Sequence, residues 1–461
     1  MSIVIFVLVL DAVPQGCYAI ALHPVRNATG EPAAQFISIM LGMPILVDKH
    51  ILLGVTGSIA AYKAADLASK LAQAGALVDV VLTPSAEKFV TPLTFQSVTG
   101  RRAYTDADLW GNEAHVLHVG LAHSADLLVI APCTANTLAK LAHGEADNLL
   151  AVTALAARCP LLIAPAMESN MYAHPATQEN LVKLTGRGAY VAGPAEGHLA
   201  SGQSGRGRML ETDKLLGHIR LVLGQKGPLA AKKVVVTAGG THEPLDPVRV
   251  ITNRSSGKQG YALAQAAIDA GAQVCLISTV NLPPPVGARV VEVRTAQEML
   301  EAVLAESAAA DALIMAAAVA DFRPKNAAQS KLKRRDGIPQ VELEAAPDIL
   351  EAVAGLGPVL PAPVPQAQVS GDEGTEKKRP KVVVGFAAES RDLIENATIK
   401  LQSKKLDIIA ANDITATDAG FSVDTNRVTL LFADGGREAL PLMSKSEVAE
   451  TIVARVAALL E

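Results

Sequence analysis

Aromatic residues are scarce in this 461-residue chain, at 3% of the total, and there is a single tryptophan. Single-stranded nucleic acid is bound largely by stacking of its bases on aromatic rings, so this scarcity argues against that class of ligand. The formal net charge of −5 provides no excess of basic residues for a polyanion either. We therefore expect no nucleic-acid partner.

Cysteines and long apolar runs are also few. The four cysteines show neither C-x-x-C spacing nor a disulfide framework, which favours a reducing cytoplasm. The apolar start, MSIVIFVLVL, is too short to span a bilayer and lacks the basic residues of a signal peptide, so we expect no membrane association. We interpret residues 1–42 as a dispensable, disordered or misassigned extension, with a cryptic export signal as the alternative. Deleting them should leave activity intact.

Small aliphatic residues make up most of the apolar half of the chain. This length favours two or three domains, and this composition suits buried parallel strands covered by Ala-rich helices. The order strand, glycine turn, helix, strand occurs twice, at residues 49–83 and again, with an insertion, at 232–278. The sequence therefore predicts an α/β protein with two doubly wound parallel-sheet domains, over residues 43–227 and 228–461.

Small polar side chains follow the predicted strands of the first half. The turn GVTGS (54–58) ends a strand and opens a helix, whose N-terminus can hold a phosphate. The segments TPSA (83–86), APCTANT (131–137) and PAMESNMY (165–172) each follow a further strand. Ligands of open α/β sheets bind at the carboxyl ends of the strands, so these segments predict a ligand site at that edge.

Taken together, the motifs resemble the bifunctional enzymes of coenzyme A biosynthesis, in which a phosphopantothenoylcysteine decarboxylase is fused to a phosphopantothenate–cysteine ligase. In the first half the resemblance rests on GVTGSIAAYK, HVGLAHSADLLVIAP, GEADNLL and PAMESNMY. In the second half it rests on GGTHEPLDPVRVITNRSSGKQG, AAVADFRPK and KLKR. It implies a flavodoxin-like flavoprotein domain followed by a Rossmann-like ligase domain.

For the first domain the resemblance implies an FMN-dependent decarboxylase. In that family the flavin oxidises the cysteinyl end of the substrate, the carboxylate leaves as carbon dioxide, and the resulting enethiolate is protonated and reduced. His118 matches the active-site histidine of the family. The resemblance assigns FMN binding to Gly57, Ser58, Ile59, Thr83, Ser85, Thr134, Asn136, Thr137 and Met167.

The glycine-rich segment HLASGQSGRGRML (198–210) resembles the mobile flap that closes over substrate and flavin. Ser201 stands where many members carry a cysteine that protonates the enethiolate, and a hydroxyl is a far weaker acid than a thiol of pKa ~8.5. Three accounts stay open: another group donates through Ser201, Cys133 reaches the site, or the reduction is slow. Glu168 replaces an asparagine that contacts the substrate carboxylate. Either Glu168 is protonated, with a raised pKa, or it faces elsewhere and Asn170 makes the contact.

For the second domain the resemblance implies a CTP-dependent ligase that forms an acyl-cytidylate and needs cations, normally lysines and Mg²⁺, around the triphosphate. Lys331 matches a catalytic triphosphate-binding lysine, and Lys333 is its neighbour. Asn253 matches the residue that converts the acyl-cytidylate, and Asp321 lies on the ribose or magnesium side. The other implied substrate contacts are Ser255, Ser256 and Gly257 for a phosphate, and Met315, Ala316, Ala317, Pro347, Asp348, Ile349, Leu350, Phe386, Lys400 and Lys404 for CTP.

The resemblance also implies assembly, because flavin sites in this family lie between subunits. We expect a cytoplasmic homo-oligomer, with a dodecamer of flavin-domain trimers and ligase dimers as one arrangement. The substitutions at Ser201 and Glu168 favour an alternative in which the ligase is active and the flavin domain is impaired or regulatory. Residues 355–381 are rich in proline and then charged, which predicts a disordered insertion.

Overall fold

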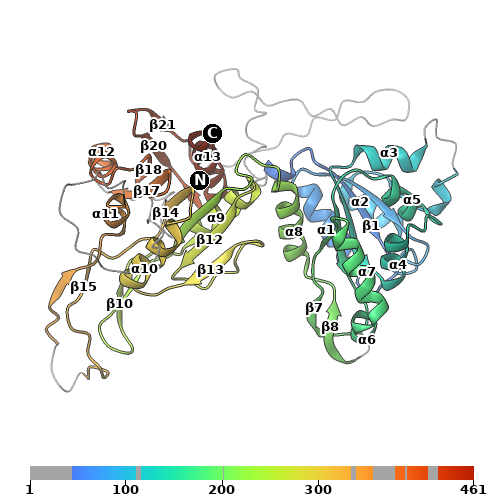
Figure 1. Ribbon diagram of the computed structural model, residues 1–461, viewed down its shortest axis with the longest axis horizontal. Coiled ribbons are helices and arrows are strands. Elements are labelled where there is room, and N and C mark those ends of the chain that lie inside the picture. The colour runs from blue at the N-terminus through green and yellow to red at the C-terminus, as the bar shows by residue number, and fades with distance from the viewer. Residues whose placement is uncertain are drawn as a thin grey trace, which may run out of the picture. The chain divides into compact units, whose positions relative to one another are not determined.

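The computed structural model describes residues 44–110, 116–200, 202–333, 339–356, 379–389, 392–413 and 424–461. The extension at 1–42, Ser201 and most of the insertion expected at 355–381 lie outside these described residues. The remainder forms two parallel-sheet units of strands and helices (Figure 1).

The first unit contains a six-stranded parallel sheet in the order β3-β2-β1-β4-β5-β6. Its strands are β1 (His50–Val55), β2 (Leu77–Leu82), β3 (Ala103–Tyr104), β4 (Leu127–Cys133), β5 (Leu161–Pro165) and β6 (Tyr190–Val191). Every residue of β4 is buried, as continuous apolar strands between two helical layers require. The strand order reverses between β1 and β4, which opens a crevice at the carboxyl ends of these strands.

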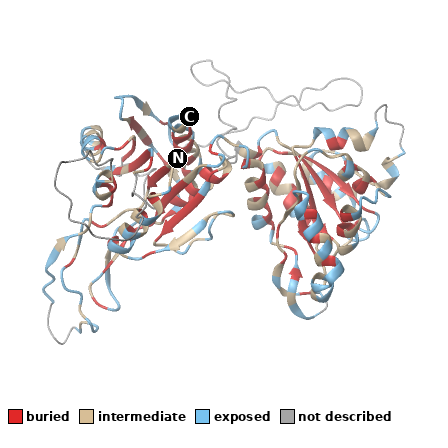
Figure 2. Ribbon diagram, in the orientation of Figure 1, coloured by how far each residue is buried: buried red, intermediate tan, exposed pale blue. Residues whose placement is uncertain are grey.

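Helices cover both faces of this sheet. One face packs against α1 (Ala61–Gln73), α2 (Pro92–Thr99) and α8 (Thr212–Gly224). The other packs against α3 (Leu117–Ser124), α4 (Ala135–His143), α5 (Leu149–Ala156) and α7 (Pro175–Gly186). In Figure 2 the buried strands lie between these layers. Short helix α6 (Ser169–Ala173) follows β5, and an antiparallel hairpin of β7 (Ala195–His198) and β8 (Ser204–Arg208) precedes α8.

The second unit contains an eight-stranded sheet in the order β13-β12-β9-β14-β17-β18-β20-β21. The strands are β9 (Lys233–Ala238), β12 (Gln273–Ser278), β13 (Arg289–Glu292), β14 (Ala312–Met315), β17 (Val382–Glu389), β18 (Ile408–Asp413), β20 (Val428–Phe432) and β21 (Arg437–Ala439). All pairs from β13 to β18 are parallel, and β20 and β21 add an antiparallel edge that the sequence did not predict. The turn between β20 and β21 is too short for a parallel crossover. The order reverses between β9 and β14.

Helices again cover both faces. One face packs against α9 (Lys258–Asp269) and α13 (Lys445–Leu460), the other against α10 (Ala296–Ser307), α11 (Ile349–Ala354) and α12 (Leu393–Ser403). Three two-stranded ribbons complete the unit: β10 (His242–Pro244) with β11 (Val250–Thr252), β15 (Phe322–Pro324) with β16 (Leu343–Ala345), and β19 (Thr425–Asn426) with β22 (Met443–Ser444). Among the described helices, none is long and apolar enough to cross a membrane.

Candidate functional sites

A cleft of about 580 Å³ lies at the switch point of the first sheet. It is lined by every residue predicted to bind FMN except Ile59, namely Gly57, Ser58, Thr83, Ser85, Thr134, Asn136, Thr137 and Met167. Ile59 lines the adjoining cleft instead and is 58% exposed. The turns after several strands therefore meet as the parallel sheet requires, and we call this cleft the flavin crevice.

Thr56 holds the two sides of the flavin crevice together. Its hydroxyl is buried, donates to the carbonyl of Pro132 at 2.7 Å, and accepts the amide of Thr134 at 3.1 Å. The turn after β1 is thereby tied to the turn after β4. Thr134 also caps α4 by accepting the amide of Thr137. The wall thus offers hydroxyls and the N-terminal end of a helix, which suit the phosphate and carbonyl oxygens of FMN.

Gly57 is explained by packing of two loops. A Cβ atom at this position would lie 2.3 Å from the Cβ of Ser85, closer than real side-chain contacts allow. The loops after β1 and β2 can approach this closely only because residue 57 has no side chain. The glycine therefore sets the shape of the crevice.

The flavin crevice also has a charged wall that the sequence did not assign. Lys140 and Asp147 line it and form an ion pair at 2.5 Å. The hydrogen bond from Lys140 lowers the pKa of the Asp147 carboxyl. Asp106 lines the same wall and accepts the amide of Leu149 at 2.9 Å. The motif GEADNLL, which contains Asp147, was the sequence signal for this wall, but it predicted no contact with a ligand.

A second cleft, of about 360 Å³, lies between the hairpin and the start of α1. We call it the hairpin cleft. Its lining comes from residues 58–63, 166–168, 198–200 and 207–209. Ser58 and Met167 line both clefts, so the two spaces adjoin. The hairpin is therefore placed to cover a space beside the flavin crevice.

Strand β8 of the hairpin packs tightly on the loop after β5. The amide of Met167 donates to the carbonyl of Gly207 at 3.0 Å, and a Cβ atom on Gly207 would lie 2.2 Å from the carbonyl oxygen of Met167. A Cβ atom on Gly205 would lie 2.8 Å from the Cβ of Ser169. The dense glycine of this segment predicts mobility. For these two glycines the structure provides a different reason, which is close backbone approach.

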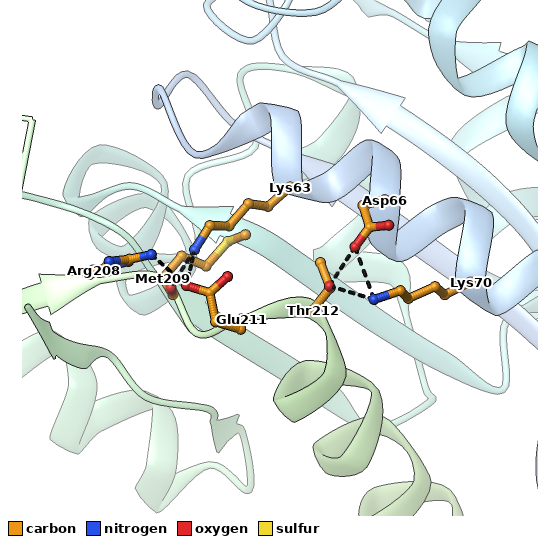
Figure 3. Close-up of polar contacts among 7 residues, drawn as sticks. All are labelled: Lys63, Asp66, Lys70, Arg208, Met209, Glu211 and Thr212. Atoms are coloured by element: carbon orange, nitrogen blue, oxygen red, sulfur yellow. Dashed lines mark hydrogen bonds and ion pairs between the residues drawn. The ribbon is translucent and has the colours of Figure 1, made fainter.

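An ion-pair cluster anchors the C-terminal end of the hairpin to α1 (Figure 3). The ammonium group of Lys63, a side chain only 8% exposed, donates to the carbonyl of Met209 at 3.3 Å and to Glu211 at 2.9 Å. Glu211 also pairs with Arg208 at 2.6 Å. The hydrogen bond from Lys63 lowers the pKa of the Glu211 carboxyl. A neighbouring set connects α1 with the start of α8: Asp66, Lys70 and Thr212.

The carboxylate of Glu168 caps α6. It accepts the amides of Asn170 and Met171 and the hydroxyl of Ser169, at 2.7, 3.3 and 2.9 Å. Desolvation acts to raise the pKa of Glu168, but these hydrogen bonds outweigh it and the pKa lies below its ordinary value. Glu168 also lines the hairpin cleft, and its protonation beside a substrate carboxylate stays a prediction. Asn170 is exposed and lines neither cleft, so the structure does not place it against a ligand.

Cys133 is not available as a proton donor. It is fully buried in the core, and burial raises the pKa of its thiol. The account in which Cys133 reaches the site is therefore wrong. His118 is half-buried on α3 and lines neither cleft in the described part of the chain, whereas Ser201 lies outside it. The roles of His118 and Ser201 stay predictions.

The second sheet carries a crevice made of two adjoining pockets, of about 500 and 230 Å³. Both are lined by Ala317, Asp321, Phe386 and Lys400. The larger pocket adds the predicted Asn253, Ser255, Ser256, Gly257 and Ala316, and the smaller adds the predicted Met315, Pro347, Asp348, Ile349 and Leu350. Residues from distant parts of the sequence therefore meet at this switch point, which we call the ligase crevice.

Buried threonines again fix the loop at the switch point. Thr237 and Thr241 accept the amides of Ala317 and Ala320, at 3.1 and 2.9 Å. The side-chain amide nitrogen of Asn253 donates to the carbonyls of Ala318 and Val319, at 3.3 and 3.1 Å. Two neighbouring carbonyls identify this atom as nitrogen, so the Asn253 oxygen is the group left for a ligand.

The predicted lysines differ in where they lie. Lys400 donates to the carbonyl of Phe386 at 2.9 Å and lines both pockets. Lys404 lines neither; it pairs with Asp348 and Glu351 at 2.9 and 3.0 Å, and the hydrogen bond that it donates to Asp348 raises the pKa of Lys404. Lys404 therefore holds the start of α11, and its contact with CTP stays a prediction.

The loop with Lys331 and Lys333 is not brought to the ligase crevice either. Both lysines are exposed and line neither pocket. The residue between them is held by a buried carboxylate, because the amide of Leu332 donates to Asp246 at 3.1 Å. Asp246 is buried and also binds Arg249. Desolvation opposes ionisation of Asp246, but its hydrogen bonds lower the pKa of the carboxyl well below the usual range.

No group of three metal-binding His, Cys, Asp or Glu side chains occurs among the described residues. Asp321, the predicted metal ligand, therefore belongs to no such group in that part of the chain, and its role at a metal stays a prediction. The larger pocket contains polar residues that sequence reasoning missed. They are Lys258, Gln259, Asn412, Asn426 and Lys445.

Comparison with known proteins identifies the family. The Flavoprotein model matches residues 45–224, and the model for the DNA/pantothenate metabolism flavoprotein C-terminal domain matches 229–358 and 367–460. The chain is 44% identical over 419 residues to the coenzyme A biosynthesis bifunctional protein CoaBC of Bacillus subtilis, covering 90% of this chain and 98% of that protein. This chain belongs to the CoaBC family. The CoaBC of Mycobacterium tuberculosis is 42% identical, covering 88% and 96%.

Solved structures match each half separately. The C-terminal domain of a CoaBC is 36% identical and covers 51% of this chain and 98% of that one, with a TM-score of 0.40. A mutant PPC decarboxylase complexed with pantothenoylaminoethenethiol is 39% identical and covers 38% and 97%, with a TM-score of 0.36. Membership of the CoaBC family makes the chain a bifunctional enzyme of coenzyme A biosynthesis, with a flavoprotein decarboxylase half and a ligase half. The alternative of an impaired or regulatory flavin half finds no support in these relatives.

Proposed function

We propose that this chain makes 4′-phosphopantetheine in two steps. In the ligase crevice, the carboxylate of 4′-phosphopantothenate attacks the α-phosphorus of CTP and releases pyrophosphate. The amine of cysteine then attacks the acyl carbon of this acyl-cytidylate and releases CMP. The flavin half decarboxylates the resulting phosphopantothenoylcysteine. The observation that carries the proposal is that one chain holds two crevices, each at a switch point and each lined by the expected residues.

In the flavin half, bound FMN would supply the oxidation that makes loss of carbon dioxide possible and the reduction that follows. The chain itself binds the cofactor and the substrate and excludes water from them. Thr134 and the N-terminus of α4 would hold oxygens of the cofactor, and the hairpin anchored by Lys63 would cover the adjoining substrate space. We propose that a homo-oligomer, in the cytoplasm, brings His118 of another copy to this site. We propose that the proton that reaches the enethiolate is delivered through Ser201.

In the ligase half, we propose that the Asn253 oxygen accepts a hydrogen bond from the cysteine amine and orients it. This follows from the two carbonyls that occupy its amide nitrogen. The N-terminus of α9, after Ser255, Ser256 and Gly257, would bind the phosphate of phosphopantothenate. Residues 315–317 and 347–350, with Phe386 and Lys400, would hold CTP.

The cations for the triphosphate complete the proposed ligase site. Lys331 and Lys333 lie on an exposed loop, and we propose that they reach the triphosphate when substrate binds or when a second copy packs against this half. Mg²⁺ would take most of its oxygen ligands from the triphosphate, with Asp321 as the protein ligand, because Mg²⁺ in such sites commonly uses one or two carboxylates and substrate phosphates.

Asn253→Asp tests the amine-orienting role. The carboxylate keeps an acceptor but faces two carbonyls it cannot donate to, so we expect pyrophosphate release at a near-normal rate and coupling to cysteine slowed by about 10- to 100-fold. Both products are followed in a single turnover, with Asn170→Asp in the other half as the matched control. Normal coupling by Asn253→Asp would eliminate this assignment.

A one-pot reaction tests the whole proposal. The protein is incubated with FMN, 4′-phosphopantothenate, cysteine, Mg²⁺ and CTP, and the products are identified by mass spectrometry. We expect phosphopantetheine and CMP together. Accumulation of phosphopantothenoylcysteine would show that the serine in the hairpin does not replace the missing acid, and absence of both products would overturn the ligase assignment.

A further inference from the structure

A polar cluster lines the larger pocket of the ligase crevice without lining the smaller one. It consists of Lys258 and Gln259 on α9, Asn412 on β18, Asn426 on β19 and Lys445 on α13. Lys258 begins the helix whose N-terminus is proposed above to bind a phosphate, and no side chain of this set has a role in the reaction described above. We call this set the α9–α13 cluster.

Two helix N-termini meet at the α9–α13 cluster. Helix α9 starts at Lys258 and helix α13 at Lys445. Gln259 holds them side by side: its amide nitrogen donates to the carbonyl of Lys445 at 3.1 Å, and its oxygen accepts from Asn426 at 3.4 Å. The N-terminus of α13 is capped by Ser444 and Glu447, whereas the N-terminus of α9 has no side-chain cap, so its amides and partial positive charge favour an anion.

Lys445 adds a full positive charge that has no ion-pair partner among the described residues. Its side chain is only 8% exposed. The nearby acid, Asp424, pairs with Lys258 instead, at 2.6 Å. Burial, followed by the neighbouring charge of Lys258, lowers the pKa of Lys445. A buried ammonium without an anion is costly, so a bound anion would stabilise it.

Asn412 supplies an independent sign of a missing ligand. Its residue is 8% exposed, and its side-chain oxygen is buried without a hydrogen-bond donor in the part of the chain that is described. Such buried acceptors are rare in folded proteins because desolvation is not compensated. Because Asn412 lines the same pocket as Lys445, a ligand with an O–H or N–H group could satisfy it there.

We infer that the α9–α13 cluster recognises a phosphate monoester that also carries a hydrogen-bond donor, with Lys445 binding the phosphate and Asn412 accepting from a hydroxyl or amide of the same molecule. The inference rests on the proposed function, in which this ligand is 4′-phosphopantothenate. That substrate has a phosphate together with hydroxyl and amide groups. Lys445 and Asn412 are then the residues that make the ligase specific for the phosphorylated substrate.

The test compares 4′-phosphopantothenate with unphosphorylated pantothenate as substrates of the full chain. Initial ligase rates are measured at saturating CTP and cysteine. For Lys445→Met we expect the KM for phosphopantothenate to rise by about 10- to 100-fold, as loss of a charge-assisted contact implies, with the KM for CTP unchanged. The preference for phosphopantothenate over pantothenate, as a ratio of kcat/KM, falls by the same factor.

Asn412→Ala should behave differently, because its partner is present in both substrates. We expect its KM to rise by about tenfold for each, with the preference unchanged. Lys445→Arg keeps the charge and should keep most of the preference. The matched control is Lys381→Met, which removes an exposed lysine outside the crevice.

The outcomes separate the two levels of the proposal. An inactive wild type on phosphopantothenate refutes the proposed function itself. An active wild type with an unchanged preference in Lys445→Met refutes only the α9–α13 cluster as the phosphate site. An unchanged KM for CTP in each preparation reports that the ligase half of that variant folds. If Lys445→Met fails this check, the comparison is made with Lys445→Gln, and an unchanged preference in Lys445→Gln overturns the inference.

Discussion

Gly207→Ala is the sharpest perturbation that the flavin half offers. The new Cβ atom would lie 2.2 Å from the carbonyl oxygen of Met167, which belongs to backbone and cannot rotate away. Strand β8 would have to move by about 1 Å to restore an ordinary contact. The same displacement lengthens the 3.0 Å hydrogen bond from the Met167 amide to the Gly207 carbonyl. The added methyl group thus disrupts the contact that holds the hairpin against the loop after β5.

The magnitude follows from these two effects. Loss of the hydrogen bond costs about 1 kcal/mol, and inserting a methyl group into a packed contact costs about 1–3 kcal/mol. The seated hairpin is therefore disfavoured by about 2–4 kcal/mol, which lowers its population by up to about 30- to 1,000-fold. Because the hairpin covers the proposed substrate space, decarboxylation should fall with it, by at least about tenfold.

The assay is release of carbon dioxide from phosphopantothenoylcysteine by FMN-loaded protein. Ligase activity of the same preparation should stay at the wild-type level, which makes the second half an internal control. The matched variant is Gly186→Ala near the end of α7, where an added Cβ meets nothing within 4 Å. Wild-type decarboxylation by Gly207→Ala would show that the hairpin need not be seated for catalysis.

Three further variants test the anchors around the two crevices. Lys63→Met replaces a buried cation whose partner Glu211 is largely exposed, so the free energy of unfolding should change by less than about 1 kcal/mol. Decarboxylase kcat/KM should fall by about fivefold or more. A fall in kcat/KM that is fully explained by the loss of folding free energy would contradict an anchoring role. Cys133→Ala should leave the decarboxylase pH profile unchanged, since the thiol is buried and its pKa raised; a shifted profile would restore it as a donor. Asp246→Asn should raise the KM for CTP and spare decarboxylation. Folding lowers the pKa of Asp246, so in the wild type the contribution of its carboxylate to anchoring Leu332 is fully present above the pKa of an unfolded aspartate. This contribution is lost only as the pH falls through the lowered pKa of the folded state. Ligase activity that depends on this loop should therefore persist into the acid range.

The regular parts of both crevices were predictable because parallel strands bring their carboxyl ends to one edge. Once GVTGS and APCTANT were placed after strands, Ser58 and Asn136 had to lie near each other, and the structure confirms this. In the second half the resemblance implied Asn253 and Phe386, and the structure places both in the larger pocket. Ile59 was the exception in the first half because it is directed toward the hairpin cleft.

Other features could not be predicted because they depend on tertiary contacts. Gly207 looked like a flexible position in sequence, and only the position of Met167 shows that it is required by packing. Lys445 and Asn412 meet through the helix that follows an antiparallel edge, which had not been predicted. The resemblance implied CTP contact for Lys404, and the sequence carried no sign of its ion pairs with Asp348 and Glu351.

The buried threonines at the two switch points have a consequence for which molecules these crevices admit. Thr56 and Thr237 form their hydrogen bonds with groups of the protein itself, and these bonds set the width of the gap between neighbouring loops. Binding then loses little freedom in the loops, which favours affinity. It also means that analogues too thick for the gap are excluded rather than accommodated. Selection by size is therefore a property of the scaffold itself, in addition to any contact made by the polar side chains.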